Sequence, residues 1–165
     1  MAALAVGTKA PDFSLTTLDG SKFSLQEALQ RGPVFAAFFK ISCPVCQYAF
    51  PYFERLYKVH GSGKVSFVAI SQDDAAKTTA FLKEFGVTLG AALDDPNGYA
   101  VSNAYGLTNV PTWFLIEPDG TIELSSVGWS KQDVDNLNAR LSNAGQSSPL
   151  PLFKPGEDVR DFRAG

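Results

Sequence analysis

The chain of 165 residues is 45% hydrophobic and contains thirteen phenylalanines, which excludes intrinsic disorder over most of its length. Fourteen Lys and Arg residues stand against seventeen Asp and Glu, a net charge of −3 without any basic run, which excludes nucleic-acid binding through phosphate contacts. No apolar stretch reaches the roughly 18 residues that a membrane-spanning helix needs, so we expect no membrane segment.

The first half of the chain predicts a hairpin, two helices and two buried strands. Residues 11–25 alternate apolar and polar side chains around an Asp-Gly pair, the pattern of a β-hairpin, and Ser24 then caps a short helix. Residues 33–40 and 65–71 are continuous apolar runs, typical of strands buried on both faces. Between them, residues 43–60 repeat apolar side chains every three or four positions, which predicts one helix, kinked at an internal proline.

The second half continues the alternation of helices and strands. Residues 75–85 and 131–143 predict helices, residues 91–93 a short strand, and residues 112–116 and 121–127 a hairpin. This order of elements predicts an α/β fold with a mixed central β-sheet flanked by helices, extended by the N-terminal hairpin.

The chain divides into a domain over residues 1–143 and a proline-containing tail over residues 144–165. Four apolar side chains distinguish this tail from an idle linker: Leu150, Leu152, Phe153 and Phe162. We therefore expect residues 149–162 to be ordered and to lie extended across the domain or across a partner subunit.

The chain has two cysteines, in the sequence Cys43-Pro44-Val45-Cys46 between a buried strand and a predicted helix. Pro44 suits the first helical position, which places Cys43 at the N-cap, where free N–H groups and the helix dipole stabilise a thiolate. We expect Cys43 to have a lowered pKa and to attack a substrate disulfide, and the more deeply buried Cys46 to resolve the mixed disulfide. A disulfide that closes so short a loop adds little stability, so the spacing favours a bond that is made and broken.

Two other uses of the cysteine pair stay open. The thiols could be buried and idle, or they could hold a soft metal such as Cu(I). A zinc site would need two further ligands, and His60 is the single histidine of the chain.

Further motifs accompany this pair along the chain. They are Gly7-Thr8-Lys9-Ala10-Pro11-Asp12-Phe13, Pro51, Lys83-Glu84-Phe85-Gly86-Val87, Ala104-Tyr105-Gly106-Leu107, Val110-Pro111-Thr112 and Asp119-Gly120. Over about residues 6–141, this set resembles the thioredoxin superfamily in its redoxin (AhpC/TSA) branch, which contains the TlpA-type thiol-disulfide oxidoreductases and the peroxiredoxins.

The resemblance implies a thioredoxin-like fold with Cys43 and Cys46 as a catalytic pair that needs no cofactor and no metal. It also implies a cis bond between Val110 and Pro111, next to Cys43. The main chain of Val110 would then be open to pair with an extended substrate, as in strand addition.

Four more residues are candidates for supporting roles. Pro44 and Val45 complete the motif between the cysteines. Lys40 either adds positive charge near the thiolate or is a solvated strand end. Trp113 either presents its ring to the active site or packs within the sheet.

Several positions depart from the family pattern. Ser42 replaces the usual tryptophan before the first cysteine, and Ala37 and Ala49 replace acids that handle the proton of the second cysteine in relatives. Water or an unidentified group would have to accept that proton. The threonine and proline that precede a peroxidatic cysteine are Lys40 and Ala36 here, which leaves a thiol peroxidase as the less favoured alternative.

The sequence therefore predicts a thioredoxin-like thiol-disulfide oxidoreductase. Its partners would be a disulfide-containing protein or small-thiol substrate and an unidentified electron donor, with no nucleic acid and no membrane involved. The N-terminal residues lack a charged segment before their short apolar stretch, so we expect a cytoplasmic protein that contributes to redox homeostasis and antioxidant defence.

Overall fold

The computed structural model describes residues 3–144 and 151–165. Its elements, in chain order, are β1 (Ser14–Thr16), β2 (Lys22–Ser24), α1 (Leu25–Leu29), β3 (Val34–Phe39), α2 (Pro44–His60), β4 (Ser66–Ser71), α3 (Ala75–Glu84), β5 (Ala91–Leu93), α4 (Ala100–Ala104), β6 (Thr112–Ile116), β7 (Ile122–Val127), β8 (Trp129–Ser130), α5 (Lys131–Ala144) and β9 (Phe162–Arg163).

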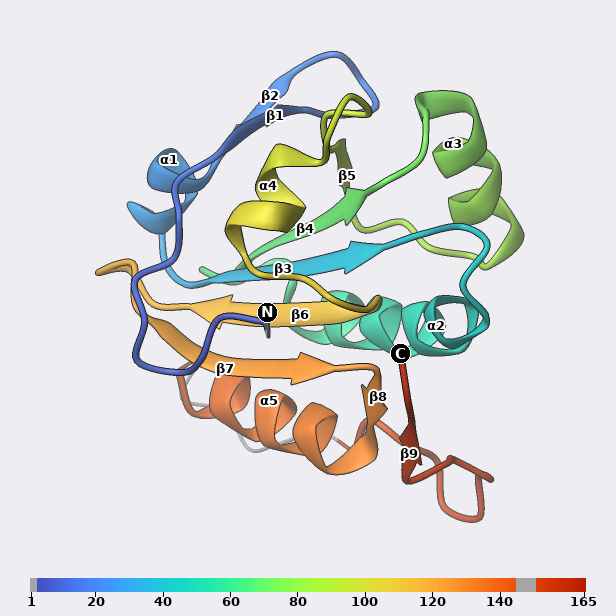
Figure 1. Ribbon diagram of the computed structural model, residues 1–165. Helices are drawn as coiled ribbons and strands as arrows, with labels where there is room; N and C mark the ends of the chain where they lie inside the picture. The colour runs from blue at the N-terminus through green and yellow to red at the C-terminus, as the bar shows by residue number, and fades with distance from the viewer. Residues whose placement is uncertain (1–2, 145–150) are drawn as a thin grey trace.

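Five strands form the central sheet, in the order β5-β4-β3-β6-β7 (Figure 1). Strand β3 pairs in parallel with β4 and antiparallel with β6, while β7 returns antiparallel to β6. The predicted mixed sheet is therefore confirmed. The predicted N-terminal hairpin is present as β1 and β2, which pair antiparallel outside this sheet.

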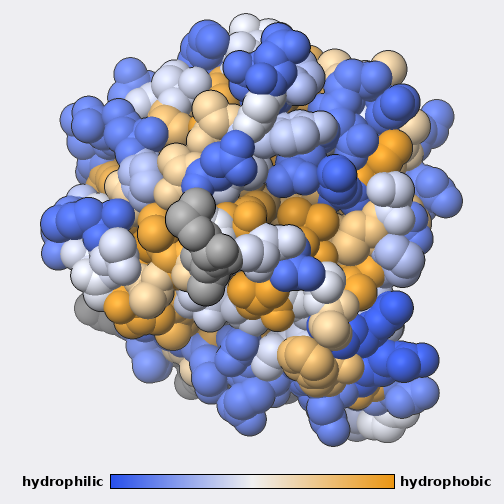
Figure 2. All heavy atoms as spheres, in the orientation of Figure 1, coloured by the Kyte–Doolittle hydropathy of each residue, from blue (hydrophilic) through white to orange (hydrophobic). Residues whose placement is uncertain are grey.

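Both faces of the sheet are covered, because β3 sends successive side chains to opposite sides. Phe35, Ala37 and Phe39 join a core with residues of α2, α3 and α5, and in this core the rings of Phe35 and Phe53 lie 5.5 Å apart. The alternate residues of β3 join a second core with α1 and the segment before β1. Figure 2 shows that apolar side chains are visible in the middle of the viewed face, within a rim of hydrophilic ones.

Local capping signals begin three of the helices where the sequence predicts. The side chains of Ser24, Asp74 and Ser130 each accept a hydrogen bond from the backbone N–H three residues later, at 3.3, 2.8 and 3.2 Å. Each bond satisfies one of the free N–H groups of a first turn. Helix α2 runs through Pro51 as one element, as expected.

The described part of the tail lies against the domain. Leu152 is buried and Phe153 is half-buried against the core that contains α2. Strand β9 pairs with β8, a pairing that the sequence does not predict. The expectation that Phe162 anchors the tail is wrong, because its side chain is 64% exposed. Leu150 and its neighbour Pro149 lie outside the described residues.

In the part of the chain that the structure describes, no helix combines the length and the apolar character needed to cross a bilayer.

Candidate active site

Cys43 occupies the N-cap of α2, immediately after the loop that follows β3. Its backbone is extended, Pro44 takes the first helical position, and the Cys43 Sγ accepts a hydrogen bond from the backbone N–H of Cys46 at 3.2 Å. The predicted placement of the first cysteine at a helix start is therefore confirmed. The free N–H groups of the first turn point at this sulfur, which favours its anionic form.

The loop before Cys43 is held by two side chains from other segments. The carboxylate of Asp73 accepts a hydrogen bond from the backbone N–H of Ile41 at 2.8 Å, and the Gln47 amide donates to the Ile41 carbonyl at 2.9 Å. The sequence analysis does not predict this contact of Asp73, and the neighbouring Asp74 caps α3. Asp73 follows β4, and the carboxyl ends of the parallel pair β3 and β4 meet at the same edge of the sheet, which is the signal that could have found it.

The two cysteines differ in exposure. Cys46 is fully buried, whereas Cys43 is half-buried, and both are free thiols. A substrate disulfide can therefore reach Cys43 directly and cannot reach Cys46.

The surroundings of Cys43 lower its pKa to about 6. The largest cause is the hydrogen bond from the Cys46 side chain, and the backbone N–H groups of Cys46 and Val45 and the positive charge of Arg163 act in the same direction. Partial burial opposes them. Cys43 is therefore largely a thiolate at neutral pH.

The pKa of Cys46 moves the other way. Burial is the main cause, because it disfavours the charged form. The hydrogen bond with Cys43 and the negative charge of Asp73 raise the pKa further. Cys46 thus stays protonated while Cys43 is ionised, which gives the two sulfurs different chemistry.

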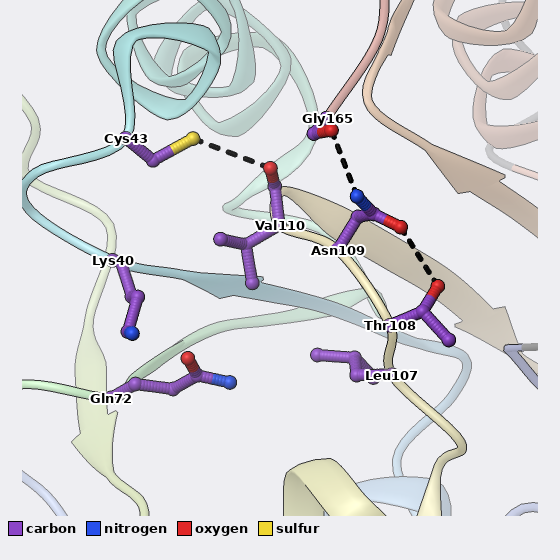
Figure 3. Close-up of a pocket in the computed structure, with 8 residues that line it drawn as sticks. All are labelled: Lys40, Cys43, Gln72, Leu107, Thr108, Asn109, Val110 and Gly165. Carbon is purple, nitrogen blue, oxygen red and sulfur yellow. Dashed lines mark hydrogen bonds between the residues drawn. The ribbon is translucent and has the colours of Figure 1, made fainter. Parts of the chain in front are cut away.

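Val110 and Pro111 lie directly beside the exposed sulfur. Their peptide bond is cis, as the resemblance implies, and the Cys43 Sγ lies 3.3 Å from the carbonyl oxygen of Val110. Figure 3 shows the sulfur pointing toward that oxygen. An open pocket of about 410 Å³ adjoins the pair, and its lining comprises Lys40, Cys43, Gln72, Leu107, Thr108, Asn109, Val110 and Gly165.

The four supporting candidates occupy different places. Lys40 lines the pocket, and Pro44 is exposed at the helix start. Val45 is buried in the core. Trp113 is 1% exposed and packs against the ring of Phe35 at 5.7 Å, so it belongs to the interior of the sheet and does not line the pocket.

Sequence reasoning missed Arg163, the tail residue whose charge acts on Cys43. No spacing or motif links it to the cysteines. Over residues 3–144 and 151–165, no group of three or more His, Cys, Asp or Glu side chains is placed to hold a metal ion.

The lowered pKa predicts how Cys43 reacts with an alkylating agent at different pH values. In the wild type, the rate of alkylation by iodoacetamide should rise as the pH increases through about 6 and then level off. The Cys46→Ala variant should have a higher midpoint, because it loses the largest stabilising hydrogen bond. Mass spectrometry of samples quenched over time measures both profiles. A wild-type midpoint at the value of a free thiol, about 8.5, would contradict this account of the site.

The chain is similar to known proteins in sequence and in fold. The redoxin family model matches residues 5–141. The thiol-disulfide oxidoreductase ResA of Geobacillus thermodenitrificans is 32% identical over 134 residues, which cover 80% of this chain and 75% of that protein. ResA of Bacillus subtilis is 29% identical over 94% of this chain and 79% of its own.

Solved structures agree with the fold. A thiol:disulfide interchange protein of Chlorobium tepidum matches with a TM-score of 0.67 and 27% identity, over 86% of this chain and 98% of that one. The thioredoxin domain of a thiol-disulfide oxidoreductase of Bacteroides vulgatus has a TM-score of 0.74 at 21% identity, over 84% of this chain and 98% of its own. With the family model matched over most of its length, the chain belongs to the redoxin family and is a thiol-disulfide oxidoreductase.

Proposed function

We propose that the protein reduces disulfides in protein or small-thiol substrates, with Cys43 as the attacking thiol and Cys46 as the resolving thiol. The observation that carries this assignment is the contrast between the two sulfurs. Cys43 is accessible and has a lowered pKa, whereas Cys46 is fully buried with a raised pKa.

The reaction proceeds in two exchanges. The Cys43 thiolate attacks one sulfur of the substrate disulfide, forms a mixed disulfide and releases the first substrate thiolate. Cys46 then gives its proton to water and attacks the Cys43 sulfur, which releases the second substrate thiolate and leaves a disulfide between Cys43 and Cys46. Two electrons have passed from the pair to the substrate, and a dithiol or other two-electron donor must reduce the pair again.

Catalytic assays separate this function from its alternatives. With dithiothreitol as the donor, the protein should accelerate the reduction of insulin disulfides and turn over hydrogen peroxide far more slowly. Rapid peroxide turnover without insulin reduction would favour the thiol peroxidase. Tight Cu(I) binding by a protein that reduces no disulfide would favour the metal-binding module.

The cellular setting is part of the proposal. A cytoplasmic protein of this kind would keep thiols reduced and so contribute to redox homeostasis and antioxidant defence. Its in vivo redox state is the measurement that checks this. Alkylation of thiols in intact cells, followed by gel separation, should find the Cys43–Cys46 pair mostly reduced, and a mostly oxidised pair would contradict it.

A further inference from the structure

The C-terminal tail leads from the middle of α2 to the thiol site. It lies beyond residues 5–141, which match the redoxin family model. Arg55, in the middle of α2, donates to the carbonyl oxygen of Leu152 at 3.2 Å and forms a two-point ion pair with Glu157 at 2.8 and 2.7 Å. From there the tail passes β9 and reaches the end of α2 that carries Cys43 (Figure 1).

Main-chain hydrogen bonds fix the path of the tail before β9. The indole N–H of Trp129 donates to the carbonyl oxygen of Arg160 at 2.6 Å, and the backbone N–H of Arg160 donates to the Tyr48 hydroxyl at 2.9 Å. The backbone N–H of Lys131 donates to the carbonyl oxygen of Asp161, also at 2.9 Å. The pairing of β9 with β8 continues this contact.

The last residues of the tail lie next to Gly128 and to the main chain of Val110, beside Cys43. Gly128 has a φ of +76°, and a Cβ at this position would overlap the carbonyl oxygen of Arg163 and lie 2.7 Å from the Gly165 nitrogen. A Cβ on Gly165 would lie 2.9 Å from the carbonyl oxygen of Val110, and the Asn109 amide donates to the Gly165 oxygen at 2.9 Å. The tail thus abuts the same carbonyl group that the reactive sulfur contacts.

We propose that Arg163–Gly165 form a specificity-determining wall, which stands where an extended polypeptide would pair with the main chain of Val110. The proposal rests on Cys43 being the attacking thiol, as proposed above. Strand addition requires a free main-chain edge, and here the tail takes up the space beside that edge. A small disulfide fits in the pocket beside Lys40 and Leu107 while the tail, whose Gly165 is part of the lining, stays in place. A polypeptide disulfide must first displace the tail.

Arg163, the first residue of this wall, also acts on the Cys43 thiolate through its charge. Its guanidinium lies 5.2 Å from the centre of the Tyr48 ring, which holds the cation near the start of α2. Its charge is one of the causes that lower the pKa of Cys43.

Deleting residues 162–165 tests the wall, because it keeps the contacts of Arg160 and Asp161 to the domain. Two quantities are measured for each variant: kcat/KM for the reduction of insulin, a polypeptide disulfide, and the second-order rate constant for the reaction of Cys43 with dithiodipyridine, a small disulfide. The deletion should raise the ratio of the insulin value to the dithiodipyridine value about tenfold. An unchanged ratio, or a fall, would overturn the proposal.

A second variant moves the wall while every tail residue is kept. Gly128→Ala introduces the overlap with Arg163 and should shift the ratio in the same direction. Gly86→Ala is its matched control, because Gly86 has a similar φ of +66° with open space around its Cβ position, and it should leave the ratio unchanged.

Arg163→Gln keeps the main chain in place, so a shift of the ratio as large as that of the deletion would show a charge effect and overturn the steric wall. If wild-type Cys43 fails to react with dithiodipyridine, the proposed function fails, and not the wall alone.

Discussion

Replacing Cys43 with Ser should lower kcat/KM for disulfide reduction by about 1,000-fold or more, to the background of the assay. A serine hydroxyl is not ionised near neutral pH and cannot replace the thiolate. Cys46 is fully buried, so its thiol cannot attack the substrate in place of Cys43. Insulin reduction with dithiothreitol as the donor measures the loss, and circular dichroism shows whether the variant keeps the fold.

The matched change at the second cysteine separates attack from resolution. Cys46→Ser keeps a hydroxyl that can donate to the Cys43 sulfur, so the first exchange with a substrate disulfide should persist. Steady-state turnover should fall because resolution is lost. A Cys43→Ser variant that retains most of its activity would contradict the assigned roles.

Replacing Trp129 with Ala should lower the free energy of unfolding by about 3–5 kcal/mol, the usual range for a buried Trp or Phe. Trp129 is fully buried, and its ring lies 4.8 Å from that of Tyr52 and 5.4 Å from that of Tyr48. The variant also loses the hydrogen bond to Arg160 that fixes the tail. Urea unfolding measures the change, and limited proteolysis should cleave the tail faster than in the wild type.

Phe162→Ala is the control for this prediction. Phe162 belongs to β9, which pairs with β8, but the residue is 64% exposed, so removal of its ring should change stability by less than about 0.5 kcal/mol. If Phe162→Ala lowered the free energy of unfolding as much as Trp129→Ala, the tail would have to pack against the domain in another way.

Local signals explain why the reactive end of the site could be predicted from the sequence. The placement of Cys43 depends on its neighbours alone, because a buried strand ends just before it and Pro44 starts a helix just after it. The contrast between the two sulfurs follows from the same helix, since Cys46 lies one turn into its apolar stripe. The position of Val110 beside Cys43 depended on the family resemblance, because the two residues are far apart in sequence.

The contributions of Asp73 and Arg163 could not be predicted in this way. Asp73 approaches the loop before Cys43 only because two parallel strands end side by side. Arg163 sits in a strand of two residues, too short to carry an alternating pattern, and its partner strand β8 is equally short. Trp113 lies two residues after Pro111, but its side chain points into the sheet interior, which closeness in sequence does not reveal.

Mapping the trapped substrate on each variant tests the central claim most directly. Cys46→Ser and Cys43→Ser are each reacted with oxidised insulin without a reductant, and the adducts are digested and sequenced by mass spectrometry under non-reducing conditions. The account predicts a stable mixed disulfide on Cys43 in the Cys46→Ser variant and none in the Cys43→Ser variant. An adduct on Cys46 in the Cys43→Ser protein, with none in the Cys46→Ser protein, would contradict it.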